Sequence, residues 1–415
     1  MRKNSPFQSS TIISLGLFAS GSLASLLYFS TLFLGNLEQN FLRFELVFFF
    51  LFALYLLAIY LVFKQKAITN QTIIITVVFA IVFRLVLLAS VPTLSVDIFR
   101  YLWDGKVQAA GINPYRFPPQ STELTFLRDN LIYPKIYRPD LRTIYPPLSE
   151  TFFVLTQLVS RNSVLIFKSF IAVIDAVSII LIMLFLKSKK IDPARVIVYA
   201  WSPLVVFEFA HSGHIDALII PFVILAIWSK IKNKDALSGV FLGLATLVKL
   251  YPAFLIFGLL ERKNLRLPFW FTLTVLVGYI PYAQVGPKIL GSLGTYLGGW
   301  GFNFLKYLLS SGLNHFLDNS SAISNIIMLS ILLIAGGAVA FRNSEEQNPK
   351  SLVPKSPPDE KIIATTILLI GLFLLFSPTI YPWYAIWILP FLSFKPSGFW
   401  LVATGLVALV YLPSI

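Results

Sequence analysis

Residues 91–152 read VPTLSVDIFRYLWDGKVQAAGINPYRFPPQSTELTFLRDNLIYPKIYRPDLRTIYPPLSETF and form a long polar segment among otherwise apolar runs. The hydrocarbon core of a bilayer cannot hold such a segment, because its backbone would lack hydrogen-bond partners there. It must therefore lie outside the membrane or in a cavity lined by protein. The chain around it should then be a membrane protein whose working part is this segment.

Two carboxylates open the polar segment and set its predicted structure. Asp97 and Asp104 stand at positions i and i+7, so on a helix they share one face with Tyr101 and Gln108. The helix should end near Gly111, because an Asn-Pro pair follows and the residue before a proline avoids helical geometry. The pattern predicts an amphipathic helix at the membrane surface with two acids on its polar side.

Composition fixes the broad class. Of the 415 residues, 57% are hydrophobic and 13% charged, and the mean hydropathy is +0.78. Apolar runs of about 20 residues recur along the chain, which predicts an all-α polytopic membrane protein. The net charge of +14 lies mostly in short loops, which is typical of membrane topology and lipid headgroups and argues against nucleic acid as a partner. The chain has no cysteine, which excludes disulfides and thiol catalysis.

We expect one domain, 1–415, with about 11 transmembrane spans and a cytoplasmic N-terminus, since the Lys and Arg residues favour that orientation. The first run is too long for a signal-peptide core and should remain as a span. Residues 93–150 would be a long extracytoplasmic loop and 342–361 a cytoplasmic linker. The predicted spans are 11–34, 41–63, 72–92, 163–186, 194–210, 215–229, 266–284, 322–341, 362–378, 381–394 and 397–413.

The segment 236–260 does not fit a simple span. Basic residues flank it on both sides, and VKLYP, a charge followed by a proline, stands near its middle. We therefore predict a re-entrant pair of short helices, about 236–249 and 252–261, with Lys249 at the tip. At that tip Lys249 could meet a lipid phosphate.

Several polar residues stand at membrane depth, where ionisable groups usually have a function or a partner. They are Arg84, Lys168, Asp175, Glu208, Asp216 and Lys249. For Arg84 and Asp175 we favour structural pairing. His211, His214 and Asp216 have a spacing that superficially resembles a metal site, but with only one further histidine and no cysteine a metal is not expected. A turn that lines the cavity and bonds substrate or Glu208 is the favoured interpretation.

Aromatic residues gather on the predicted non-cytoplasmic side. They are Trp300, Phe302, Tyr381, Trp383, Tyr384 and Trp387. Such residues most often anchor a protein at the membrane interface. Their crowding is equally typical of a surface that stacks on sugar or grips lipid, and both interpretations stay open.

The sequence DIFRYLWDGKVQAAGINPY (97–115), with TIYPPL (143–148), resembles the first extracytoplasmic loop of GT-C glycosyltransferases. The most similar branch includes bacterial polyprenyl-phosphate-mannose-dependent mannosyltransferases and the eukaryotic enzyme that adds the first mannose of GPI anchors. This chain has Trp103-Asp104-Gly105 where that eukaryotic enzyme has an Asp-Ala-Ala turn. Three later stretches fit the bacterial branch: WSPLVVFEFAHSGHIDAL (201–218), LATLVKLYP (244–252) and SPTIYPWYAIWILPFL (377–392).

The resemblance implies a GT-C-like membrane fold, a lipid-phosphate sugar donor, inversion at the anomeric carbon and an aspartate base in the first loop, for which Asp97 is the closest match. The chemistry of sugar transfer requires similar groups. An acceptor hydroxyl needs a carboxylate to take its proton, and a phosphate leaving group needs fixed cations, which Arg100 and Lys249 could supply. A nucleotide-sugar enzyme would need a soluble nucleotide-binding domain, and no stretch is long enough.

We therefore expect a hexosyltransferase, with mannose favoured, in the cell membrane with an extracytoplasmic active site, a glycolipid or glycan acceptor and no metal or cofactor. Asp97 would be the base and Asp104 a second acid. The predicted substrate contacts are Tyr101, Tyr145, His211, His214, Asp216, Tyr251, Tyr381, Trp383 and Tyr384. The rival interpretations are a transporter or lipid flippase, which would use Asp175 and Lys249 at mid-membrane, and a non-catalytic membrane subunit.

Overall fold

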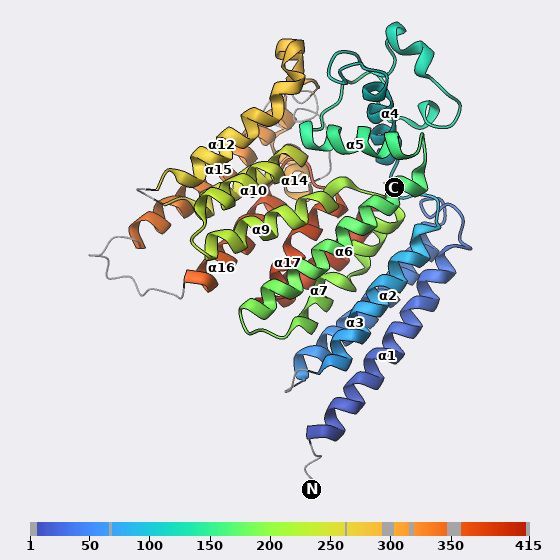
Figure 1. The fold of residues 1–415 in the computed structure, drawn as a ribbon, viewed down its shortest axis with the longest axis vertical. Coiled ribbons are helices and arrows are strands. Elements are labelled where there is room, and N and C mark those ends of the chain that lie inside the picture. Colours follow the sequence, from blue (N-terminus) through green and yellow to red (C-terminus); the bar gives the residue numbers. More distant parts are fainter. Residues whose placement is uncertain are drawn as a thin grey trace. The chain divides into compact units, whose positions relative to one another are not determined.

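The computed structural model describes residues 6–65, 69–261, 264–292, 303–314, 319–346 and 358–411. Within these residues every regular element is helical (Figure 1). The chain divides into two compact units. The first comprises Met1–Ile98, Val164–Ala217 and Ala385–Ile415, and the second comprises Phe99–Ser163 and Leu218–Tyr384.

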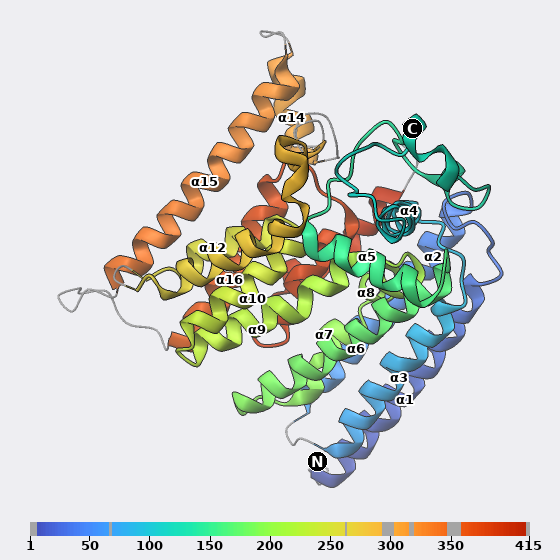
Figure 2. The same ribbon diagram turned by 45° about the horizontal axis from the view of Figure 1, so that its top comes forward.

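Long helices dominate the first unit. α1 packs against both α2 and α3, and α6 follows after an insertion that belongs to the second unit (Figures 1 and 2). Their bounds are α1 Pro6–Thr31, α2 Phe41–Lys64, α3 Asn70–Leu88 and α6 Val164–Ser188. Short pieces complete this unit: η3 Pro193–Val196, α7 Ile197–Ala200, α8 Pro203–Val206, η4 Phe207–His211, η5 Ile215–Leu218, α17 Leu389–Leu392, α18 Gly398–Leu406 and η9 Val407–Tyr411.

A buried ion pair lies inside the first unit: Arg84 and Asp175, for which structural pairing roles were predicted, pair with each other. Arg84 Nε lies 2.5 Å from Asp175 Oδ2, and Tyr199 donates a hydrogen bond of 2.6 Å to Asp175 Oδ1. Arg84 Nη1 donates to the carbonyl oxygens of Ala80 and Ala200. These bonds connect α3, α6 and α7, so the ion pair and its hydrogen bonds hold the three helices together within an apolar bundle.

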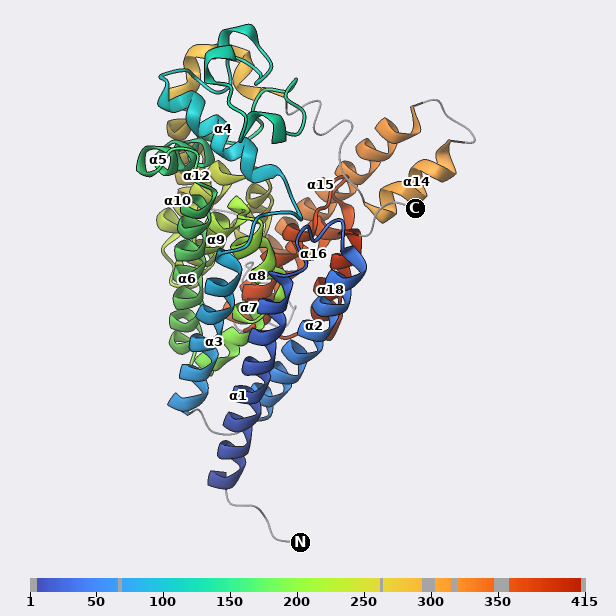
Figure 3. The same cartoon turned by 90° about the vertical axis from the view of Figure 1, so that its right-hand side faces the viewer.

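The second unit contains the polar segment and a set of mostly shorter helices. α10 lies between α9 and α12, and α15 packs against α14 and α16 (Figures 2 and 3). The elements are α4 Asp97–Ala109, which starts in the first unit, η1 Thr122–Leu127, η2 Tyr133–Lys135, α5 Pro147–Val159, α9 Ile219–Ile231, α10 Asp235–Val248, η6 Tyr251–Leu255, α11 Ile256–Leu259, α12 Arg266–Tyr279, η7 Ile280–Leu290, α14 Phe304–Leu313, α15 Ser320–Glu346, α16 Pro358–Phe376 and η8 Pro382–Ile388, which ends in the first unit.

The described residues do not confirm the predicted count of about 11 spans. By length and composition, five described helices can cross a membrane: Thr11–Thr31, Phe41–Lys64, Asn70–Leu88, Val164–Ser188 and Ser320–Asn343. The span predicted at 194–210 is two helices bent by 63°, and counting that pair as one span gives six. Two other predicted spans each combine an α-helix with a 3-10 segment that adjoins it: η5 precedes α9, and η7 follows α12.

The predicted interruption at Lys249 is confirmed. α10 ends at Val248, Lys249 has an extended backbone (φ −146°, ψ 149°), and the chain resumes as η6 and α11. The placement of this pair in the membrane stays a prediction. The linker predicted at 342–361 is shorter than expected, because α15 extends to Glu346 and α16 begins at Pro358. Residues 347–357, Trp300, Phe302 and His315 lie outside the described residues.

Candidate active site

The predicted helix of the polar segment is α4, which runs from Asp97 to Ala109 and ends before Gly111. It crosses α5 where it has no side chain: a Cβ on Gly105 would lie 2.4 Å from the carbonyl oxygen of Phe153. Most of its predicted polar face is covered. Tyr101 is buried, and the Asp104 side chain is 3% exposed against 33% for Asp97. Of the two acids, Asp97 is the more exposed.

In the first unit, Asp97 lies in a row of three ionisable side chains. His214 Nδ1 is 3.8 Å from Asp97 Oδ2, and His214 Nε2 is 3.3 Å from Glu208 Oε2. His214 and Glu208 are fully buried, and Tyr411 of η9 donates a hydrogen bond to Glu208 Oε1. The structure thus brings together two predicted site residues, Asp97 and His214, with Glu208, which was predicted as a possible partner of the turn that contains His214.

His211 and Asp216 lie in the same unit but contact other groups. Thr93 N–H donates to His211 Nε2 at 3.1 Å, and His211 Nδ1 lies 2.7 Å from Ser90 Oγ. Both ring nitrogens therefore hold the chain that leads from α3 to Asp97. Asp216 is buried and accepts a hydrogen bond of 3.1 Å from Trp387 Nε1.

Lys168 reinforces the same connection from α6. Its Nζ is buried and donates to the carbonyl oxygens of Leu87, at 3.1 Å, and Ser90, at 2.6 Å. These carbonyls end α3, where a positive charge also complements the helix dipole. Lys168 and His211 together fix the backbone just before Asp97.

The second acid of α4, Asp104, forms an ion pair within the second unit. Arg100 Nε lies 2.9 and 2.8 Å from the two oxygens of Asp104, and its Nη1 donates to the Leu141 carbonyl at 2.9 Å. Arg100, predicted to hold phosphate, thus ties Asp104 to the end of the polar loop. The predicted contacts Tyr101 and Tyr145 pack edge to face, with ring centroids 5.1 Å apart.

Glu150, at the start of α5, is an ionisable residue that is not among the predicted site residues. It is fully buried; Gln108 Nε2 donates to Oε2 at 2.7 Å, and Thr143 Oγ1 lies 2.5 Å from Oε1. Burial raises the pKa of Glu150 well above its usual value, and the nearby Asp104 charge raises it further. In the sequence Glu150 stands two residues before the apolar stretch FFVL (152–155), and no motif marks it.

The raised pKa of Glu150 gives a testable stability profile. The unfolded chain releases the Glu150 proton near the ordinary glutamate pKa, whereas the folded chain retains it to a higher pH, so stability should fall as pH rises between the two. A pKa that is one higher in the folded than in the unfolded chain corresponds to a fall of about 1.4 kcal/mol. Glu150→Gln keeps the shape and the bonds to Gln108 and Thr143 and should remove this fall. The measurement is thermal unfolding of both proteins in detergent at pH 5 and pH 8.

Glu123→Gln is the matched control, because Glu123 is an exposed acid of the same loop. It should leave the pH dependence of the melting temperature as in the wild type. A Glu150→Gln protein that loses stability from pH 5 to pH 8 as steeply as the wild type would show that Glu150 does not hold its proton in the folded state.

Five predicted site residues meet at the break after α10. Lys249 Nζ lies 5.1 Å from the ring centroid of Tyr384 and 5.9 Å from that of Trp383, distances typical of cation–π contacts. Tyr381 stacks on Trp383 with ring centroids 4.6 Å apart and planes within 3°, and Tyr251 lies beside Tyr384. We call these five residues the Lys249 cluster. A cation among flat aromatic faces can bind a phosphate and stack on a sugar.

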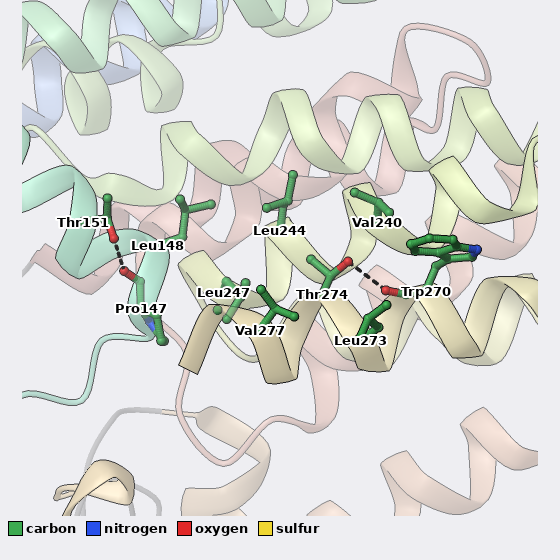
Figure 4. A pocket seen from close by; sticks show the side chains of 11 residues that line it. Pro147, Leu148, Thr151, Val240, Leu244, Leu247, Trp270, Leu273, Thr274 and Val277 are labelled. Carbon is green, nitrogen blue, oxygen red and sulfur yellow. Dashed lines mark hydrogen bonds between the residues drawn. The ribbon is translucent and has the colours of Figure 1, made fainter. Parts of the chain in front are cut away.

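An apolar pocket of about 360 Å³ opens between α5, α10 and α12 of the second unit (Figure 4). Thr151 stands at its polar end: its hydroxyl donates to the Pro147 carbonyl and lies 3.5 Å from Tyr282 Oη, which donates to Gln108. The pocket wall is thus linked to the Glu150 bonds. Its lining is Pro147, Leu148, Thr151, Val240, Leu244, Leu247, Trp270, Leu273, Thr274, Val277 and Gly278.

Among the described residues, no group of three or more His, Cys, Asp or Glu side chains is placed to hold a metal ion.

Comparison with known proteins identifies a family. A family model described as alpha-(1->6)-mannopyranosyltransferase, N-terminal domain, matches residues 7–261. No curated protein matches the chain.

Proposed function

Because the chain belongs to the alpha-(1->6)-mannopyranosyltransferase family, we propose that it is a GT-C-like enzyme that moves mannose from a polyprenyl-phosphate donor to an acceptor hydroxyl, with inversion and with Asp97 as general base. The match covers the polar segment, the turn with His214 and the break at Lys249. Mannosyl transfer follows from the family. The donor, the stereochemistry and the residue roles are the proposal.

The exposure of Asp97 is the observation that carries the assignment of the base. Its carboxylate is one-third exposed, whereas Asp104 is buried and bonded to Arg100. In the proposed step the acceptor oxygen forms a bond to the anomeric carbon from the face opposite the leaving group. The bond from that carbon to the phosphate oxygen breaks, and its electron pair leaves with the lipid phosphate. Asp97 takes the acceptor proton.

The leaving phosphate needs a cation, and Lys249 is the better supported of the two predicted residues. Arg100 uses Nε and Nη1 on Asp104 and Leu141. Lys249 stands at an interruption of the helix with its ammonium over two aromatic rings. We therefore assign it to the donor phosphate, and the rings of its cluster to sugar or lipid contacts.

At least five helices can cross a membrane, so the protein is membrane-embedded. A donor and an acceptor that are both lipid-linked would then reach the enzyme in the bilayer. We place it in the cell membrane with the N-terminus in the cytoplasm and the active site on the extracytoplasmic side, where a glycolipid or glycan would be the acceptor. A transporter is less well supported, because Asp175 is closed into its pair with Arg84 and Tyr199.

The test uses the full chain in liposomes with a mixed extract of membrane lipids and glycans as acceptor. Radiolabelled polyprenyl-phosphate mannose, polyprenyl-phosphate glucose and GDP-mannose are supplied separately. We expect transfer from the lipid-linked mannose alone, with the new linkage opposite in configuration to the donor linkage by NMR. Transfer from GDP-mannose alone, retention of configuration, or movement of the intact lipid across the bilayer without transfer would each contradict the proposal.

A further inference from the structure

We propose that His214 is a positioning residue of this reaction: held between Glu208 and Asp97, its imidazole orients the Asp97 carboxylate and keeps it ionised. The inference rests on the proposed role of Asp97 as base. It adds a function for a buried histidine and for Glu208, neither of which needs to touch the substrate.

The geometry gives the imidazole two anionic neighbours. Nδ1 lies 3.8 Å from Asp97 Oδ2, and Nε2 lies 3.3 Å from Glu208 Oε2. An ionised carboxylate on each side favours the charged form of the ring and opposes the effect of burial, which favours the neutral form. A charged imidazole beside Asp97 then disfavours protonation of Asp97, so the base stays ready for the acceptor proton.

The backbone fixes His214 in this place. Its N–H donates to the carbonyl oxygen of Glu208 at 3.0 Å across a turn that closes at Gly213, whose φ is +75°. A Cβ on Gly213 would lie 2.9 Å from Ile98 Cδ1, so the turn packs against the residue next to Asp97. At the far end, Tyr411 bonds Glu208. The row is thus held at its centre and at both ends.

The same segment contains a matched contrast. His211 is also buried, but its ring nitrogens contact the neutral groups of Ser90 and Thr93. Replacing it should disturb packing without changing the charge beside Asp97. The titratable groups around His214, from all the elements at the row, are Asp97 of α4, Lys168 of α6, Glu208 and His211 of η4, Asp216 of η5 and Tyr411 of η9.

The first test does not depend on activity. The chain has three histidines, so ¹⁵N-histidine labelling of the full protein in nanodiscs gives few signals, and the one lost in His214→Gln is assigned to His214. We expect the titration midpoint of His214 to fall by about one pH unit or more in Asp97→Asn and again in Glu208→Gln, because each change removes an anion. In Glu123→Gln and His211→Gln it should not move.

The second test is the pH profile of mannosyl transfer in liposomes. If the imidazolium keeps Asp97 ionised, His214→Gln should move the acidic limb of the rate profile to higher pH by about one unit or more. His211→Gln should leave that limb in place, and a purely structural role of His214 would lower the rate at every pH without moving the limb.

The results separate this inference from the proposed function. A His214 midpoint that does not move in Asp97→Asn, or an acidic limb that does not move in His214→Gln, overturns the inference even if transfer is robust. Absence of transfer from every lipid-phosphate sugar, with the His214 midpoint still falling in both variants, contradicts the proposed function instead and leaves the charged row established.

Discussion

Replacing Asp97 by asparagine should lower the turnover of mannosyl transfer by about 10²–10⁴-fold, the usual contribution of a general base. The amide has the shape of the carboxylate but cannot take the acceptor proton. Asp97 is partly exposed, and α4 is also held by its contact with α5 at Gly105, so the fold should persist. Initial rates with radiolabelled polyprenyl-phosphate mannose, wild type against variant, give the comparison. The KM for the donor should change little.

Two variants make this result specific. Glu123→Gln is the same chemical change at an exposed site of the same loop and should leave turnover unchanged. Asp104→Asn breaks a buried pair with Arg100. It should therefore lower the free energy of unfolding, whereas the turnover of the folded fraction should change little. If the Asp97 variant kept wild-type turnover and the Asp104 variant, still folded, lost it, the base would be Asp104.

Replacing Arg84 by methionine should destabilise the first unit by about 3–5 kcal/mol, because it leaves the charge of Asp175 buried without its cation. Tyr199 alone would then bond that carboxylate. The loss should appear in equilibrium unfolding of the full chain in mixed detergent micelles. Arg84→Lys should give an intermediate value, since it retains the charge but not the planar group that also reaches Ala80 and Ala200.

A double variant controls for the loss of packing. Arg84→Met combined with Asp175→Leu removes both charges and should recover much of the lost stability, since buried pairs are often replaceable by apolar groups of similar size. If the double variant were no more stable than Arg84→Met, the unpaired charge would not be the cause of the destabilisation.

Local chemistry made some of this structure predictable. Gly111 with Asn113-Pro114 predicted the end of α4, and the charge and proline in VKLYP predicted the interruption at Lys249. The need to neutralise charges at membrane depth predicted structural pairing roles for Arg84 and Asp175, and the two residues pair with each other. The resemblance to GT-C mannosyltransferases likewise rested on short local motifs, such as those at 97–115 and 143–148. The match to the mannosyltransferase family model confirms that resemblance.

Other features depend on partners far along the chain. Hydropathy depends on composition and does not reveal bends, so the segment 194–210 was predicted as one span although its helix breaks at Trp201-Ser202. Glu150 was missed because its partners, Gln108 and Thr143, come from another helix and a loop. Tyr411 reaches Glu208 across 203 residues, and no local pattern encodes such a contact.

The π-helical turn Phe207–His211 affects how related sequences should be aligned with this one. A π-turn holds one residue more than an α-turn, and such turns arise when a single residue is inserted into a helix. Loss of that residue would rotate the following side chains by about 100° relative to the preceding helix. In a homologue with a one-residue gap between Phe207 and His214, the histidines would therefore align in sequence but would occupy different positions in the structure. An imidazole beside the aspartate of that homologue would have to come from elsewhere in its chain.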